Sequence, residues 1–134
     1  MRLRLELFVS DMRASVAFYT EVLGFHVMRA DPDYVSVRNG SVVLGLGPAA
    51  KLPETGVGPG FTRQRLRADK GAGVEIVLEL DDLDELSALY RRCQARGVVA
   101  AALREQPWGL HDFRVADPDG YYLRVTHGDA AEAE

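Results

Sequence analysis

Charged side chains alternate with apolar ones in two segments of the sequence, and they are the first candidates for chemistry. Leu3–Val9 reads LRLELFV and Val74–Leu80 reads VEIVLEL. Alternate side chains of a β-strand point to opposite faces, so this pattern places Arg4 and Glu6 on one face of their strand, and Glu75 on the matching face of the other. An arginine there favours an anionic or carboxylate-bearing ligand, whereas a carboxylate favours a cationic one.

The histidines and the cysteine offer less. His111 could be a metal ligand or a general base, but no second histidine lies near it in the sequence, and His26 and His127 fall at the ends of other predicted strands. A structural or surface role is the favoured interpretation of His111. Cys93 falls at a predicted core position of a helix. The sequence contains no phosphate-binding loop, Ser-His-Asp set or CxxC pair.

Composition and charge limit the class of protein. The chain has 134 residues, of which 47% are hydrophobic and 27% are charged, with a net charge of −4. A nucleic-acid binder should be basic, and no apolar run reaches the roughly 20 residues that span a bilayer. A single cysteine forms no internal disulfide, so a reducing cytoplasm is the expected location. We expect neither nucleic acid nor a membrane as a partner.

Helices and strands follow the same order in the two halves of the chain. In the first half we expect strands over 3–9, 25–29, 34–38 and 41–46, and a helix over 12–23 that Ser10 or Asp11 caps and Gly24 ends. In the second half we expect strands over 74–80, 100–105, 111–116 and 121–126, and a helix over 83–96. Residues 47–73 are rich in proline and glycine and read as a long loop or linker.

An internal repeat relates the halves. A shift of 71 residues places Leu3 on Val74, Arg4 on Glu75 and Asp11 on Asp82. Each half therefore reads as a βαβββ unit, with one apolar sheet face covered by its helix.

Two motifs carry a resemblance to a known family. Val9–Phe25, VSDMRASVAFYTEVLGF, resembles the first-helix signature of the vicinal-oxygen-chelate superfamily, which includes glyoxalases, bleomycin resistance proteins and extradiol dioxygenases. Phe113–Tyr121, FRVADPDGY, resembles its last hairpin. With the repeat, the resemblance extends over nearly the whole chain, from about residue 2 to 127. It implies an α+β fold in which two βαβββ modules form a curved mixed sheet with a concave cleft, and it implies a homodimer.

The resemblance also sets the expected domain boundaries. We expect one domain over residues 1–127, with modules at about 2–47 and 73–127 and a linker over 48–72. The small acidic tail, residues 128–134, is expected to be disordered.

The metal-dependent members of the superfamily take four ligands from equivalent strands. The first-strand ligand is usually a histidine seven residues before the helix-leading aspartate, which corresponds here to Arg4 and Glu75. The last-strand ligand is usually a glutamate four residues after the hairpin glycine, which corresponds to Leu44, next to Gly45, and to Arg124. Arginine presents only donors and leucine has no ligating atom, whereas a zinc site needs at least three protein ligands. We therefore expect no metal and no other cofactor.

Ligand contact is the alternative use of these positions. Glu75 could pair with one or both of Arg4 and Arg124 in a structural cluster, or an arginine could contact the ligand. Trp108 lies in a W-G-x-x-x-F segment that borders the ligand groove in the antibiotic-binding branch of the superfamily, and its ring could stack on a planar ligand or anchor the loop. The full set of candidate ligand-binding residues is Arg4, Glu6, Phe8, Leu44, Glu75, Trp108, His111, Tyr122 and Arg124.

These observations favour a metal-free protein that sequesters an antibiotic or a related planar natural product at a dimer interface. The alternatives are a metal-dependent lyase or dioxygenase of the same superfamily, and a metal-independent auxiliary protein of a biosynthetic pathway. No residue is assigned a catalytic role.

Overall fold

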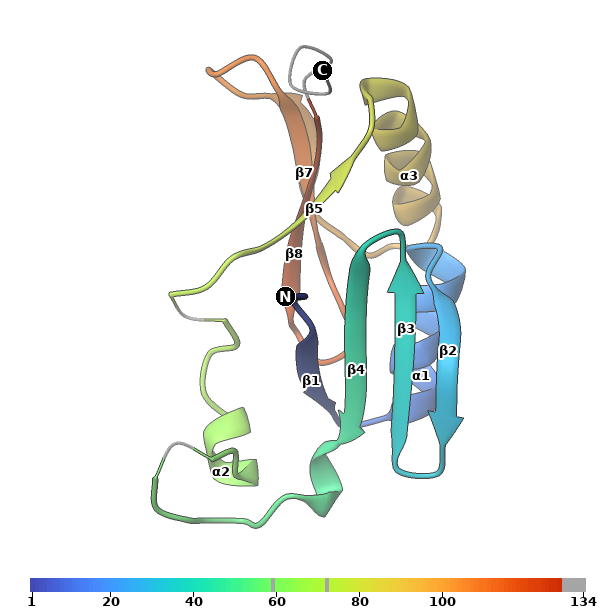
Figure 1. Ribbon diagram of the computed structural model, residues 1–134. Coiled ribbons are helices and arrows are strands. Elements are labelled where there is room, and N and C mark those ends of the chain that lie inside the picture. The colour runs from blue at the N-terminus through green and yellow to red at the C-terminus, as the bar shows by residue number, and fades with distance from the viewer. Residues whose placement is uncertain (59, 72, 129–134) are drawn as a thin grey trace. The chain divides into compact units, whose positions relative to one another are not determined.

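The computed structural model describes residues 1–58, 60–71 and 73–128, and the chain divides into two compact units, Met1–Lys70 and Gly71–Glu134 (Figure 1). Residues 129–134 of the predicted disordered tail lie outside the described residues. The first unit contains β1 (Leu5–Val9), α1 (Met12–Ala17), η1 (Phe18–Val22), β2 (His26–Asp31), β3 (Tyr34–Asn39), β4 (Val42–Pro48), η2 (Ala49–Lys51) and α2 (Arg63–Leu66). The second contains β5 (Ile76–Leu80), α3 (Leu83–Ala95), β6 (Val99–Glu105), β7 (His111–Ala116) and β8 (Tyr122–His127).

Each unit holds one mixed four-stranded sheet, as the repeat predicts. The strand order is β1-β4-β3-β2 in the first sheet and β5-β8-β7-β6 in the second. In both sheets the first strand of the module pairs in parallel with the last, and the other neighbours are antiparallel. The predicted α+β class with two βαβββ modules is confirmed. We call the modules of the first and second units module 1 and module 2.

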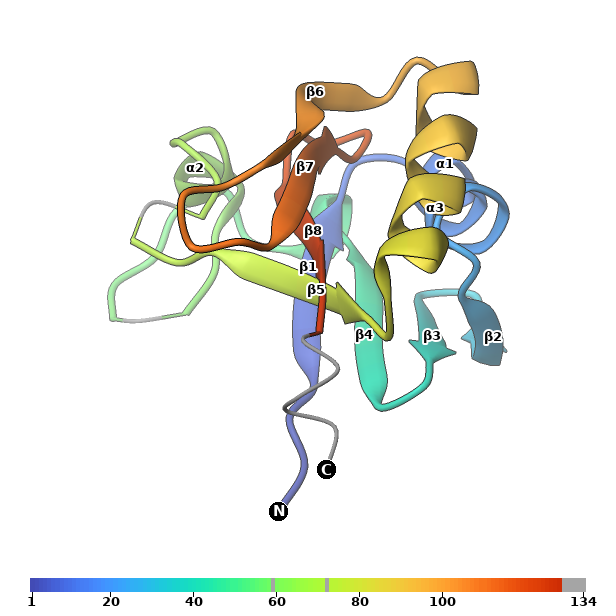
Figure 2. The same cartoon turned by 90° about the horizontal axis from the view of Figure 1, so that it is seen from above.

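One face of each sheet is buried against the helix of its own module. In module 1, α1 lies behind the sheet in the view of Figure 1, and in module 2, α3 lies along β5–β8, which Figure 2 shows from above. The period-two pattern explains this arrangement, since alternate apolar side chains of each strand reach the helix side. The residues least exposed on these faces are Val9, Val37, Leu44 and Leu46 in module 1, and Phe113, Val115, Leu123 and Val125 in module 2.

Equivalent aspartates begin the two main helices. The Asp11 carboxylate accepts a hydrogen bond from Ala14 N at 3.0 Å, and the Asp82 carboxylate accepts one from Glu85 N at 2.8 Å. Both aspartates have extended backbone, as N-cap residues do. The predicted 71-residue repeat therefore holds at the level of individual hydrogen bonds.

The first helix differs from the expected continuous α-helix. It is α-helical only to Ala17 and continues as the π-helical turn η1. At the end of this turn, Leu23 N donates to Phe18 O and Phe25 N donates to Tyr19 O. The Thr20 hydroxyl donates to the Val16 carbonyl at 2.7 Å, and such a bond competes with the backbone ladder. The hydrogen bond from the Thr20 side chain thus coincides with the π-helical turn.

The connection between the modules is also more structured than the expected loop, because it contains the short helices η2 and α2. Within the described ranges, none of the helices combines the length and apolar character that crossing a bilayer requires.

Candidate functional site

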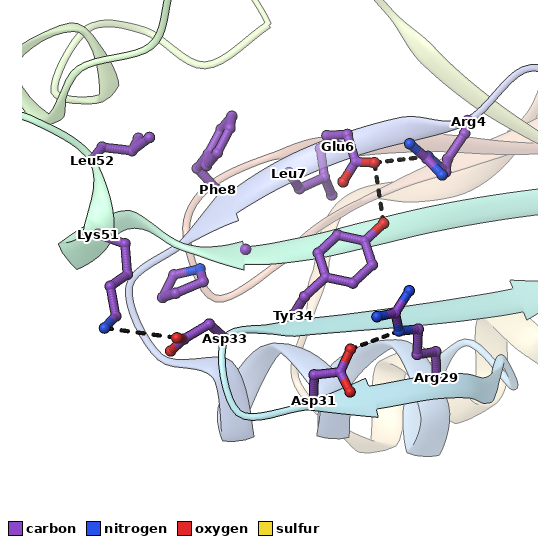
Figure 3. A pocket seen from close by; sticks show the side chains of 12 residues that line it. Arg4, Glu6, Leu7, Phe8, Arg29, Asp31, Asp33, Tyr34, Lys51 and Leu52 are labelled. Atoms are coloured by element: carbon purple, nitrogen blue, oxygen red, sulfur yellow. Dashed lines mark hydrogen bonds and ion pairs between the residues drawn. The ribbon is translucent and has the colours of Figure 1, made fainter.

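The polar face of the module 1 sheet carries a pocket with a volume of about 680 Å³ (Figure 3). Leu5, Leu7 and Val9 of β1 alternate toward the core, so Arg4, Glu6 and Phe8 emerge on the opposite face. The pocket is lined by Arg4, Glu6, Leu7, Phe8, Arg29, Asp31, Asp33, Tyr34, Gly47, Pro48, Lys51 and Leu52. Three residues of this face, Arg4, Glu6 and Phe8, were predicted to contact a ligand.

Glu6 is the centre of the hydrogen bonding in this pocket. Its Oε1 atom lies 2.7 Å from Arg4 Nε and accepts a hydrogen bond from the Tyr34 hydroxyl at 3.1 Å (Figure 3). Burial raises the pKa of Tyr34, and the hydrogen bond to Glu6 raises it further. The phenol therefore remains a donor at neutral pH and holds the carboxylate against the sheet.

Gly45 makes this arrangement possible. It lies opposite Glu6 in the parallel pairing of β1 with β4. A Cβ atom on Gly45 would overlap both the Glu6 carboxylate and the Tyr34 hydroxyl. The absent side chain thus leaves the space in which those two groups meet.

Leu44, which was predicted to contact a ligand, lies one residue away from the polar-face position. Leu44 lies opposite Leu5 in the strand register and is only 1% exposed, on the core face. In module 2, Leu123 holds the same place opposite Ile76, so the equivalent of Arg124 is Gly45. The two hairpin turns differ in length, since Asn39 pairs with Val42 whereas Ala116 pairs with Tyr122. Counting from the turn glycine therefore reaches different strand positions in the two modules.

The polar face of module 2 carries a second cluster of charged side chains, centred on Arg124. Arg124 Nε donates to Glu75 Oε1 at 2.7 Å, and Arg124 Nη1 donates to Asp112 Oδ2 at 3.3 Å. The Tyr122 hydroxyl donates to Glu75 Oε2 at 3.0 Å. Asp112 is 3% exposed and also accepts a 2.7 Å hydrogen bond from Gln106 Nε2. The pairing of Glu75 with Arg124 that the sequence suggested is present in the structure.

These contacts keep Glu75 ionised. The hydrogen bond from Arg124 lowers the pKa of Glu75, and the hydrogen bond from Tyr122 lowers it further. The same contacts raise the pKa of Tyr122 and that of Arg124, because both donors are held by a carboxylate. Arg114 adds a second positive group beside Glu75, with its Nη2 atom 3.9 Å from Glu75 Oε2.

His111 and Trp108, two further predicted ligand contacts, lie near the beginning of β7. His111 stands beside His127, with ring centroids 5.8 Å apart, and the backbone N–H of His111 donates to His127 Nε2 at 3.1 Å. His111 Nδ1 is buried without a hydrogen-bond partner among the described residues. Trp108 lies in the turn before β7 and is 64% exposed, so most of its ring faces solvent.

Tyr34, Gly45 and Asp112 were missed by the sequence analysis. A usable signal existed for two of them, since Tyr34 begins a strand that was predicted correctly, and the alternation of His111–Ala116 places Asp112 on the face of Arg124. Gly45 could be found only from the strand register.

With this register, the positions that the superfamily resemblance assigns to metal ligands become Arg4, Gly45, Glu75 and Arg124. This donor set does not fit a divalent cation, because guanidinium groups present only donors and repel the ion, and glycine has no side chain. Glu75, the one carboxylate, is already held by Arg124. No group of three or more His, Cys, Asp or Glu side chains in the described part of the chain could hold a metal ion.

Comparisons with known proteins agree with the fold. The structure is similar to a lactoylglutathione lyase from Agrobacterium tumefaciens, with 21% identity, a TM-score of 0.73 and coverage of 96% of this chain and 93% of the other. It is also similar to a bleomycin resistance determinant encoded on the transposon Tn5, with 24% identity, a TM-score of 0.68 and coverage of 96% and 98%. A glyoxalase/bleomycin resistance protein/dioxygenase from Nocardioides is 26% identical, with a TM-score of 0.71 and coverage of 95% and 82%.

A search of curated proteins gave no significant match. The family model of the Glyoxalase/Bleomycin resistance protein/Dioxygenase superfamily matches residues 3–125. The chain belongs to this superfamily.

Proposed function

We propose that this chain is a metal-free small-molecule binding protein, which sequesters an antibiotic or a related planar natural product in a cleft at the interface of two chains. The observation that carries the proposal is the 2.7 Å ion pair between Arg124 and Glu75. It compensates the one carboxylate among the four superfamily metal positions. A metal ion at Glu75 would have to displace this guanidinium and would still lack the remaining ligands.

The similar structures differ in what their names say about function. One is called a lactoylglutathione lyase and another a bleomycin resistance determinant. The metal-dependent enzymes of the superfamily require the ligands that are replaced here, so the chemistry of these four positions favours a binding function over a lyase or a dioxygenase.

Trp108 supports a planar ligand. Its ring is 64% exposed in the turn before β7, and an exposed indole offers a flat surface for stacking on an aromatic system. We propose that this ring borders the ligand cleft.

The first test is the metal content of protein purified without a chelator or an affinity tag, measured by mass spectrometry together with the molar mass in solution. A metal-free folded dimer is the expected result. A stoichiometric amount of transition metal would contradict the proposal and would direct attention to the metal-dependent alternative.

The second test is a fluorescence titration with bleomycin and with planar antibiotics. Trp108 is the only tryptophan of the chain, so all quenching of indole emission reports on this one ring. Saturable quenching is expected for at least one compound, and calorimetry on W108F should show weaker binding of that compound. If calorimetry detects binding of none of the compounds, the result would contradict a sequestering role.

A further inference from the structure

The connection after η2 folds back on itself through Glu54. The Glu54 carboxylate accepts hydrogen bonds from Arg63 Nε at 3.1 Å and from Arg67, whose Nη1 and Nη2 atoms lie 2.5 Å and 3.1 Å from its two oxygens. Arg63 N also donates to Pro53 O at 2.9 Å. We call residues 53–58 and 60–67 the connecting segment. Its two ends are joined by an ion-pair cluster and a backbone hydrogen bond, so it has a defined shape.

The connecting segment brings Phe61 onto Phe8. The two ring centroids are 4.7 Å apart and the ring planes are inclined by 42°. Thr62, the next residue, is 3% exposed and caps α2 by accepting a hydrogen bond from Arg65 N at 3.1 Å. Thr62 is therefore held in place beside Phe61, so the aromatic contact is made by an ordered part of the connecting segment.

Phe61 is open to solvent although it contacts Phe8. It is 54% exposed, so about half of this side chain is available for contact with a ligand. Phe8 lines the module 1 pocket, and its ring stands away from β1 in Figure 3. The two rings thus form a continuous aromatic surface at the border of that pocket.

The charges of the pocket cancel one another in pairs. Arg4 pairs with Glu6 at 2.7 Å, Arg29 pairs with Asp31 at 2.6 Å, and Lys51 pairs with Asp33 at 3.7 Å. Among the residues that line the pocket, three are basic and three are acidic, so the formal charge of the lining is zero. A ligand with a large net charge of either sign gains little attraction from such a lining.

We propose that Phe8 and Phe61 form an aromatic binding surface for the planar ring of an uncharged or zwitterionic ligand. This proposal rests on the proposed binding function and names the ligand class and a further contact residue, Phe61. Glu54 is a positioning residue, because it affects ligand binding only by fixing the shape of the connecting segment.

The proposal is tested by calorimetric titration of the full-length protein with three planar probes: acridone, which is uncharged, proflavine, which is a cation, and anthraquinone-2-sulfonate, which is an anion. We expect acridone to bind most tightly, with an affinity that changes little with salt. F61A should weaken acridone binding about tenfold, in line with the loss of one aromatic stacking partner.

Matched variants separate stacking from general damage. F61Y keeps a planar ring and should bind like the wild type, whereas F61L keeps apolar bulk without the ring and should behave like F61A. Val57 is another apolar residue of the connecting segment and is 101% exposed, so V57A should leave binding unchanged. E54Q should weaken acridone binding. A proton NMR spectrum of the aromatic region should also show a changed Phe8–Phe61 contact in this variant. Thermal unfolding of each variant verifies that it is folded.

The outcomes distinguish this proposal from the function on which it rests. If acridone binds and F61A binds it as well as V57A does, the aromatic surface is not the site, and the binding function stands. Tighter and strongly salt-dependent binding of either charged probe overturns the predicted ligand class. If the folded wild-type protein binds none of the probes and none of the antibiotics, the binding function itself fails, and this proposal fails with it.

Discussion

Arg124 Nε lies 2.7 Å from Glu75 Oε1. This ion pair joins a residue of β8 to the residue that precedes β5. On the other side of the same guanidinium, Asp112 Oδ2 lies 3.3 Å from Arg124 Nη1. The side chain of Arg124 is 22% exposed, whereas that of Asp112 is 5% exposed and that of Glu75 is 36% exposed. Two carboxylates in different environments thus hold one cation, and their contributions should differ.

Substitution D112N should destabilise the protein more than E75Q. The amide in place of the Asp112 carboxylate would leave a partly buried guanidinium with a neutral neighbour, and losing one charged hydrogen-bonding partner in a buried site costs about 1–3 kcal/mol. Glu75 is more exposed, and exposed ion pairs contribute only about 0.2–1 kcal/mol. Urea unfolding of both variants, followed by circular dichroism, measures the two free energies. Equal losses would mean that the burial of Asp112 has no energetic consequence.

The ion pair also predicts how stability depends on pH. Contact with Arg124 lowers the pKa of Glu75 in the folded protein, so the unfolded chain binds this proton more readily. The stabilisation is therefore complete above the ordinary glutamate pKa of about 4.3 and is lost as the pH falls through the lowered folded value. The difference in unfolding free energy between wild type and E75Q should shrink from about pH 6 to about pH 3. A constant difference over this range would exclude Glu75 as the titrating group.

Gly45 and Gly47 provide a matched pair of substitutions on one strand. In G45A the new Cβ atom overlaps the Glu6 carboxylate and the Tyr34 hydroxyl, whereas in G47A it lies 3.7 Å from the Phe8 ring, an ordinary contact. Replacing glycine where no strain results stabilises a protein by about 0.4–1 kcal/mol through the unfolded chain. We therefore expect G47A to be neutral or stabilising.

The G45A variant should be less stable than G47A. The overlapping atoms are the ends of side chains that can move, so the expected loss is only about 1 kcal/mol, but the Glu6–Tyr34 hydrogen bond should be broken. Loss of that bond removes one of the causes that raise the pKa of Tyr34, and an absorbance titration of the phenols against pH detects the change. A Tyr34 titration identical in G45A and G47A would contradict the assigned geometry.

Much of this structure follows from local sequence patterns. Alternation in Leu3–Val9 correctly separates Leu5, Leu7 and Val9 from Arg4 and Glu6, because side chains of a strand must point to opposite faces. The aspartate caps and the repeat predict both helices. Capping is also a local relationship, because it depends on residues only three positions apart.

The features that sequence reasoning missed depend on contacts between distant segments. Leu44 was predicted as a ligand contact in place of Gly45 because the strand register depends on the length of a hairpin turn, and a shift by one residue exchanges the faces. The contact between Phe8 and Phe61 joins residues that are far apart in sequence, in a connecting segment that also contains the ion pairs of Glu54. Neither relationship leaves a periodic pattern that could be read in advance.

Cys93 gives a direct measure of how tightly the core of module 2 is closed. Its side chain is 0% exposed on α3, and burial raises the pKa of its thiol to about 11. Since the thiolate is the reactive form, both the protonation state and the packing protect it. Native protein should therefore react with a disulfide reagent such as DTNB no faster than it unfolds, while protein in concentrated guanidinium chloride should react completely. The C93A variant gives the background. Rapid labelling of the native protein would show that α3 separates from its sheet without global unfolding, which would contradict the predicted protection of Cys93.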